Sequence, residues 1–171
     1  MLEIDLNQLK RDKTIVREVG VEPEEFDVSR FGFCLSSPIS VNLKAYHANN
    51  EALTVKGSIE TLVEQECRRC LKPVETKMMT KLDLHFTSKQ APQISEKIEE
   101  ELQFDWSQGE LDLMEYLFQE IVLNAPAFVE CDQSCRGICA GCGTNLNKLK
   151  CDCPEKATDP RWNVLLKNSN K

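Results

Sequence analysis

Nine cysteines are distributed unevenly along this chain of 171 residues. Cys67 and Cys70 form a CxxC pair near the middle. Six more lie close together in a tail segment: Cys131, Cys135, Cys139, Cys142, Cys151 and Cys153. Thiolates at such spacings are ligands for Zn²⁺ or for iron–sulfur clusters. We expect structural zinc, because sites built only from sulfur, with no open position, are typically structural; an iron–sulfur cluster is the alternative.

The eight cysteines fit two sites of four thiolates each. In the preferred partition, Cys67 and Cys70 share one ion with the first two tail cysteines, and the last four tail cysteines bind another. A single site that uses Cys139, Cys142 and some of the others is the alternative. The sequence therefore predicts one or two zinc ions per chain. Cys34 stands apart from the others, near Phe31 and Phe33, which is typical of a buried structural cysteine.

The rest of the sequence bears on the compartment of the protein and on the chemistry of the CxxC pair. The first residues lack the basic and apolar regions of a signal peptide, and no apolar stretch is long enough to span a membrane. We therefore expect a cytoplasmic protein, in which disulfides are disfavoured. A redox role for Cys67 and Cys70 is the lesser alternative, because a strand rather than a helix follows the pair.

Charge is segregated along the chain. The net charge of −7 disfavours a general polyanion binder, and acidic residues dominate residues 94–120. Basic residues accompany the cysteines instead: Arg68, Arg69, Lys72, Arg136, Lys148 and Lys150. These side chains are candidate contacts for RNA phosphates or for a protein partner, and an exposed, solvated turn is the alternative interpretation.

The elements that position these residues can be predicted from periodicity. Alternating apolar and polar residues predict strands over 39–45, 53–63 and 74–86, with turn residues at 47–51. They form an antiparallel meander with the CxxC pair at a hairpin tip. Ile4 and Leu6 predict an additional edge strand, and a short strand is expected around 102–106 after an exposed loop at 89–101.

One amphipathic helix is predicted to cover the sheet. Apolar residues recur at helical spacing from Met114 to Ala125, Asp112 and Glu115 suit a capping box, and Pro126 ends the pattern. The prediction is an α+β fold: an antiparallel β-meander packed by one main helix, with a cysteine-rich zinc-binding tail. We expect a domain over residues 1–130 and a tail over 131–171 that docks on it.

Taken together, these motifs resemble the YceD family, also described as domain of unknown function 177. The resemblance rests on CRRCLKP at residues 67–73, on CRGICAGCGTNLN at 135–147 and on DPRW at 159–162. Ile4 to Leu6 and the helix at 111–126 also fit. Trp162 stands where leucine is usual in the family's closing motif.

The resemblance implies a non-enzymatic ribosome biogenesis factor. Such a factor supports 23S ribosomal RNA accumulation or processing and large-subunit assembly, through ribosomal RNA, a large-subunit ribosomal protein or a pre-ribosomal particle. No nucleotide-binding or hydrolase motif appears in the sequence. The alternatives are a structural zinc adaptor without RNA contact and, less favoured, a thiol redox or RNA-processing enzyme.

Overall fold

The alternating strands form one long, curved sheet in the computed structural model, which describes residues 2–47, 51–90 and 102–154. β4 (Ile39–His47), β5 (Ala52–Glu66) and β6 (Pro73–Ser88) pair antiparallel in sequence order, as predicted. β2 (Thr14–Val21) pairs with β4, and β7 (Leu102–Phe104) runs parallel to β6. β3 (Cys34–Leu35) pairs with the far end of β5. The predicted α+β class is confirmed, with a mixed, mainly antiparallel sheet.

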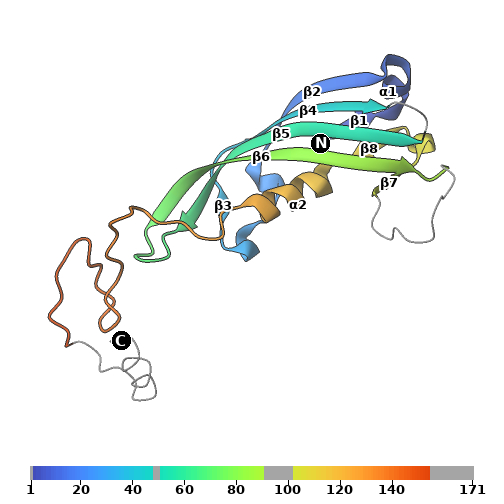
Figure 1. The fold of residues 1–171 in the computed structure, drawn as a ribbon. Coiled ribbons are helices and arrows are strands. Elements are labelled where there is room, and N and C mark those ends of the chain that lie inside the picture. Colours follow the sequence, from blue (N-terminus) through green and yellow to red (C-terminus); the bar gives the residue numbers. More distant parts are fainter. Residues whose placement is uncertain (1, 48–50, 91–101, 155–171) are drawn as a thin grey trace, which may run out of the picture.

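One face of the sheet carries the core. Leu53, Val55, Ile59 and Val63 of β5 are buried, as the period-two pattern predicted, and the alternate side chains face solvent. α2 (Met114–Asn124) lies across this face and buries Leu117 and Ile121 (Figure 1). Neither this helix nor any other in the described ranges is long and apolar enough to cross a membrane.

The beginning of the chain differs from the prediction. Ile4 lies in a strand, β1 (Glu3–Asp5), but this strand pairs with β8 (Glu110–Asp112) in a separate two-stranded sheet. Leu6 is not in a strand, because it begins a second helix, α1 (Leu6–Asp12). The carboxylate of Asp5 accepts a hydrogen bond of 2.8 Å from the amide of Gln8 and caps this helix. The expected edge strand was therefore wrong in its partner and its length.

Three short 3₁₀ turns complete the described elements: η1 (Pro23–Glu25), η2 (Ser29–Phe31) and η3 (Trp106–Gln108). The expected strand around 102–106 is confirmed as β7, followed by η3. The expected turn at 48–50, most of the loop at 89–101 and the motif at 159–162 lie outside the described residues.

Two details near the helix and sheet require correction. The N-cap of α2 is Leu113, one residue after Asp112, and the Asp112 carboxylate accepts from the Met114 amide at 2.8 Å. Glu115 accepts from Gln119 within the helix, so the predicted capping box does not form. Cys34, expected to be buried, is exposed. It lies on β3, the short strand that pairs with the end of β5.

Candidate metal centres

The first candidate centre begins at the tight turn between β5 and β6. The Cys67 amide donates to the Lys72 carbonyl at 2.8 Å, and the Leu71 amide donates to the Cys67 carbonyl at 2.9 Å. Leu71 adopts a left-handed backbone conformation with φ 58°. The Arg69 amide points at the Cys67 sulfur, at 3.5 Å. These bonds hold the two sulfurs of the CxxC pair in the geometry of a zinc knuckle.

The segment after α2 brings the tail beside this turn. The Gln65 side chain donates to the Pro126 carbonyl at 2.7 Å. The Arg68 amide donates to the Val129 carbonyl at 3.0 Å, and Cys67 and Val129 form an isolated parallel bridge. The chain therefore runs along the hairpin end before it reaches Cys131.

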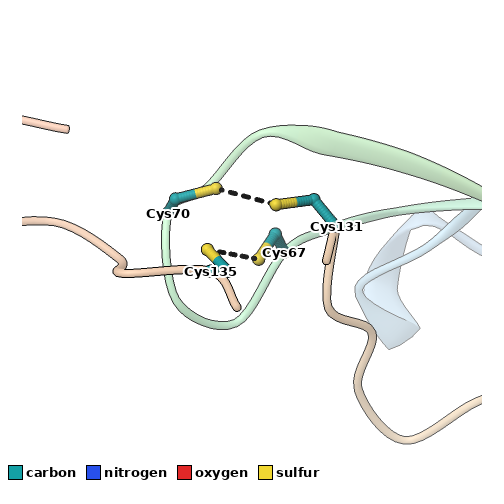
Figure 2. Close-up of side chains that lie close together, drawn as sticks. All are labelled: Cys67, Cys70, Cys131 and Cys135. Atoms are coloured by element: carbon teal, nitrogen blue, oxygen red, sulfur yellow. Dashed lines mark hydrogen bonds between the residues drawn. The ribbon is translucent and has the colours of Figure 1, made fainter. Parts of the chain in front are cut away.

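Four cysteine sulfurs meet at this point (Figure 2). The sulfurs of Cys67, Cys70, Cys131 and Cys135 all lie within 4.8 Å of one another. The Cys67–Cys135 distance is 4.0 Å and the Cys70–Cys131 distance is 3.5 Å. Four thiolates about 2.3 Å from a tetrahedral ion are separated by about 3.8 Å, so this spacing suits a single ion. Three of these cysteines are buried, which favours a closed site over an open one.

Hydrogen bonds lower the pKa of two of these thiols, which favours the thiolate form that binds a cation. A bond from the Cys131 backbone, helped by the Arg69 amide, lowers the pKa of Cys67 to about 6. Burial opposes ionisation of Cys135, but the Asn147 amide and the Gly137 backbone hold its pKa below the ordinary value. The Cys131 pKa rises to about 12 through its contact with Cys70. Without metal, some of the four sulfurs are therefore protonated and others ionised, and a bound cation displaces the remaining protons.

The second candidate centre lies entirely in the tail. The sulfurs of its four cysteines are again within 4.8 Å of one another: Cys139, Cys142, Cys151 and Cys153. The Gly141 amide points at the Cys139 sulfur, at 3.3 Å, and the Cys139 amide donates to the Thr144 carbonyl at 2.8 Å. This centre is more exposed than the first. Its turn can bind one tetrahedral ion by the same geometry.

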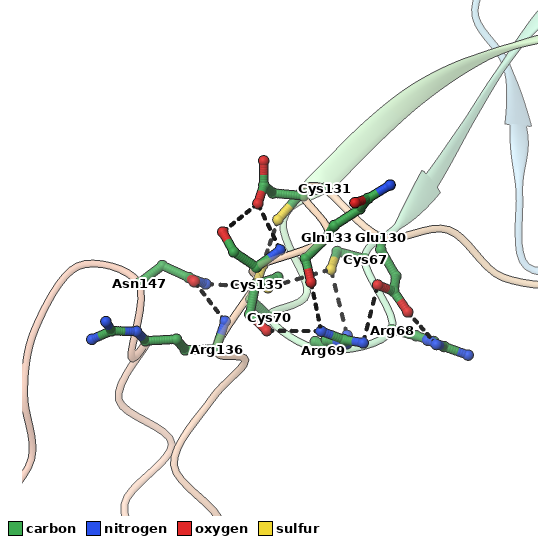
Figure 3. Close-up of polar contacts among 12 residues, drawn as sticks. Cys67, Arg68, Arg69, Cys70, Glu130, Cys131, Gln133, Cys135, Arg136 and Asn147 are labelled. Carbon is green, nitrogen blue, oxygen red and sulfur yellow. Dashed lines mark hydrogen bonds and ion pairs between the residues drawn. The ribbon is translucent and has the colours of Figure 1, made fainter.

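Asn147 joins the two centres. Its amide nitrogen donates to the Cys135 sulfur at 3.3 Å, and its side-chain oxygen accepts from the Arg136 amide at 2.8 Å (Figure 3). The Ile138 amide donates to the Arg69 carbonyl at 3.0 Å, so the tail also bonds to the hairpin turn. The structure thus brings together the same two sets of cysteines that the preferred partition groups.

Two of the candidate partner-binding residues have contacts within the molecule. Arg68 and Arg69 both pair with Glu130, the latter at 3.2 Å. Arg69 also donates to the Cys135 carbonyl at 3.1 Å, and Arg68 lies over the ring of Phe128, 4.5 Å from its centroid. These arginines hold the tail on the hairpin as well as presenting charge, while Lys72 and Arg136 are exposed beside them.

Comparison with known proteins places the chain in a family. The model of the family "Large ribosomal RNA subunit accumulation protein YceD" matches residues 55–167. The chain belongs to the YceD family. The match includes both cysteine clusters and α2, so the residues that carried the resemblance are the residues that the family model covers.

Two curated relatives are similar to parts of this YceD chain. The chloroplastic large ribosomal RNA subunit accumulation protein YCED homolog 1 of Arabidopsis thaliana is 34% identical over 67 residues, 39% of this chain and 21% of the relative. An uncharacterized protein of Mycobacterium leprae is 28% identical over 131 residues, 75% of this chain and 58% of that protein. In both cases the chain spans less than two thirds of the relative's length. No solved structure matches the chain significantly.

Sequence reasoning missed three residues of this YceD centre. Glu130 clamps the two arginines, Asn147 connects the centres, and Phe128 presents its ring to Arg68. Glu130 and Phe128 lie directly before the first tail cysteine, and Asn147 lies between two cysteine pairs. Their proximity to the ligands in sequence was the available signal, but nothing in the spacing specified their partners.

Gly137 lies close against the hairpin turn, and replacing it should loosen the first centre. Its φ is 75°, and a Cβ there would lie 2.9 Å from the Arg69 carbonyl oxygen. We expect Gly137→Ala to release metal to a coloured chelator at least about tenfold faster, because backbone strain and the clash cost about 1–2 kcal/mol or more.

Gly32→Ala is the matched control for Gly137→Ala. Gly32 has a similar φ of 80°, but nothing lies within 4 Å of a Cβ there. It shares the left-handed strain without the contact with Arg69. Equal release rates in the two variants would contradict a tail held at Gly137.

Proposed function

We propose that this YceD chain is a non-enzymatic factor that supports accumulation of large-subunit ribosomal RNA by binding that RNA during subunit assembly. The family name implies the role in ribosomal RNA accumulation. The observation that carries the binding step is the bond between Ile138 and Arg69, because it gathers the hairpin and tail basic residues at one end of the molecule. Such a factor would act on a pre-ribosomal particle in the cytoplasm.

Each cysteine cluster holds one structural Zn²⁺ in this proposal. In the first centre, two sulfur pairs lie 3.5 and 4.0 Å apart and all four sulfurs lie within 4.8 Å of one another, which supports a single ion. A cluster of several irons would place its own iron and sulfide atoms between the ligands and hold the thiolates farther apart. Four thiolates leave no position for a catalytic water, which favours a scaffold over an enzyme. The tail over 131–171 is then a metal-dependent unit that docks on the domain over 1–130.

The RNA-binding surface consists of the exposed basic residues around the two centres: Arg68, Arg69, Lys72, Arg136, Lys148 and Lys150. The side chains of Arg68 and Arg69 remain 45% and 40% exposed despite their pairing with Glu130. Each side chain can therefore contact a phosphate while it keeps its ion pair with Glu130. Phosphate contacts of this kind supply affinity without sequence readout, so base recognition would come from elsewhere on the surface.

Reversing the charge of three exposed lysines around the cysteine centres tests this function. We expect Lys72→Glu/Lys148→Glu/Lys150→Glu to weaken binding to 23S ribosomal RNA fragments about 10–100-fold at low salt. The slope of log affinity against log salt should fall by about 2–3 in magnitude, because roughly one counterion is released per phosphate contact. Filter binding across a salt series measures both quantities.

The control is an equal charge reversal on the solvent face of the sheet. Lys44, Lys56 and Lys81 lie there on the neighbouring strands β4, β5 and β6. They are distant from the hairpin end that carries Cys67 and Cys70. Lys44→Glu/Lys56→Glu/Lys81→Glu should leave RNA affinity within about twofold of the parent. If both triple variants lose affinity equally, or if neither does, the surface around the centres is not the RNA-binding surface.

A further inference from the structure

A groove lies between α2 and the segment that connects β2 with β3. Its volume is about 420 Å³, and its apolar floor consists of Phe26, Met114 and Phe118. The rings of Phe26 and Phe118 stack with centroids 5.8 Å apart, and Phe31 meets Phe118 edge-on at 6.0 Å. Figure 1 shows this connecting segment, in light blue, beside α2 under the sheet. Leu117 and Ile121 anchor the helix, which leaves Phe118 to line the groove.

The rim of this groove is acidic. Glu25, Asp27 and Glu115 line it, and no ion pair within the described ranges neutralises any of the three. Hydrogen bonds from Ser29 hold the pKa of Asp27 below its ordinary value, so this carboxylate is charged at neutral pH. The one cation at the rim, Arg30, lies over the rings of Phe31 and Phe118 at 4.8 and 5.9 Å.

We propose that this groove binds a basic protein segment that packs an apolar side chain against Met114 and the exposed sides of the stacked Phe26 and Phe118 rings. The apolar floor gives such a side chain a place to be buried, and lysines or arginines on either side meet the acidic rim. The same rim repels a nucleic acid, so the groove is unsuited to RNA. This inference goes beyond the proposed RNA binding and uses none of its residues.

The groove and the cysteine centres lie on different parts of the molecule. The groove involves the first half of α2, whereas the centres lie past the hairpin end, beyond the last residue of the helix (Figure 1). A basic protein segment and an RNA can therefore bind one chain at the same time. This arrangement would bring a basic protein and its RNA into proximity.

Methionine methyl groups provide a direct test. Met114 lines the groove, while Met79 is 66% exposed on β6 and serves as an internal control. The probe is a short amphipathic peptide of lysine and leucine, titrated into the full chain labelled with ¹³C at the methionine methyls. We expect the Met114 resonance to move saturably and the Met79 resonance to stay in place. A silent Met114, or equal movement of both, would overturn the proposal.

Two peptide controls and two protein variants separate the apolar and charge contributions. The peptide with glutamate for lysine should not bind, and the peptide with serine for leucine should bind at least about tenfold more weakly. Glu25→Lys/Glu115→Lys should weaken binding of the original peptide about tenfold, and added salt should weaken it further. Glu18→Lys/Glu64→Lys, on the sheet, should change it less than about twofold. Equal effects of the two double variants would mean only non-specific attraction to an acidic protein.

Discussion

Removing the metal from both cysteine centres is expected to unfold the tail and to leave the sheet folded. The described tail after α2 contains no helix or strand, and its main buried cluster consists of cysteines. Metal binding contributes about 10–16 kcal/mol to small domains of this kind, and nothing else in the described part of the tail, up to residue 154, replaces it. The sheet and α2 keep a separate core of buried aliphatic and aromatic residues.

Hydrogen exchange with and without a strong chelator measures this effect region by region. Protection should be lost at the amides of Ile138 and Cys139, which bond to Arg69 and Thr144. It should persist in β4, β5 and β6. Global loss of protection would mean that the sheet depends on the metal, and unchanged protection throughout would contradict a metal-supported tail.

Single substitutions assign the ions to the two centres. Cys135→Ser removes one sulfur of the buried centre, and elemental analysis should show zinc falling from about two ions to about one per chain. Cys34→Ser is the control, because Cys34 is exposed on β3 and belongs to neither group of sulfurs. Absence of zinc from the parent chain would overturn the metal assignment itself.

The second large effect is expected at Gly57, in the middle of β5. A Cβ at this position would lie 2.3 Å from the carbonyl oxygen of Asn42 on β4 and 3.1 Å from the Cα of Leu43. Because both are backbone atoms, no side chain can rotate away, and the two strands must separate locally. We expect Gly57→Ala to lower the free energy of unfolding by about 3 kcal/mol.

Gly20→Ala is the matched control for Gly57→Ala. Gly20 lies in β2, and nothing lies within 4 Å of a Cβ there. Its replacement should be neutral or slightly stabilising, because alanine reduces the entropy of the unfolded chain. Urea unfolding followed by circular dichroism gives both values. If Gly57→Ala lowers the free energy of unfolding no more than Gly20→Ala does, the close contact with β4 contributes little to stability.

The central hairpin was predictable because its residues alternate with few exceptions, such as Leu62 and Met79. Leu53, Val55, Ile59 and Val63 form one buried face, and the same period continues in β6. The grouping of the cysteines was predictable for a similar reason. A hairpin tip and a glycine-rich turn leave few ways to bring four sulfurs together.

β2 and α1 were not predictable from periodicity. In β2, the apolar Val16 is 72% exposed and the polar Arg17 lies on the same side of the strand as the buried Ile15, so residue types do not alternate along the sequence. α1 is a short helix that buries only Leu6 and Leu9, which is too brief a pattern to separate from a strand. Both elements depend on partners far away in sequence, and local patterns carry no information on such partners.

The contacts of the basic residues could not be predicted from the sequence either. The pairing of Arg68 and Arg69 with Glu130 joins positions about sixty residues apart, and charge alone did not distinguish a clamp from a free binding surface. The groove at Phe118 was hidden for the same reason. The helical pattern assigned this ring to the core, but Phe26 and Phe31 meet it from a segment without regular periodicity.

The pairing of β1 with β8 sets an order for folding during synthesis. Ile4 leaves the ribosome more than a hundred residues before its partner Leu111. β2, β4, β5 and β6 pair in order along the sheet, so they can assemble as they emerge. Until β8 and α2 appear, much of the apolar face of this sheet lacks its cover, which makes the half-made chain a substrate for chaperones or for aggregation. The amide of Leu113 then bonds to the carbonyl of Leu2 and joins the segment before β1 to the helix that completes the core.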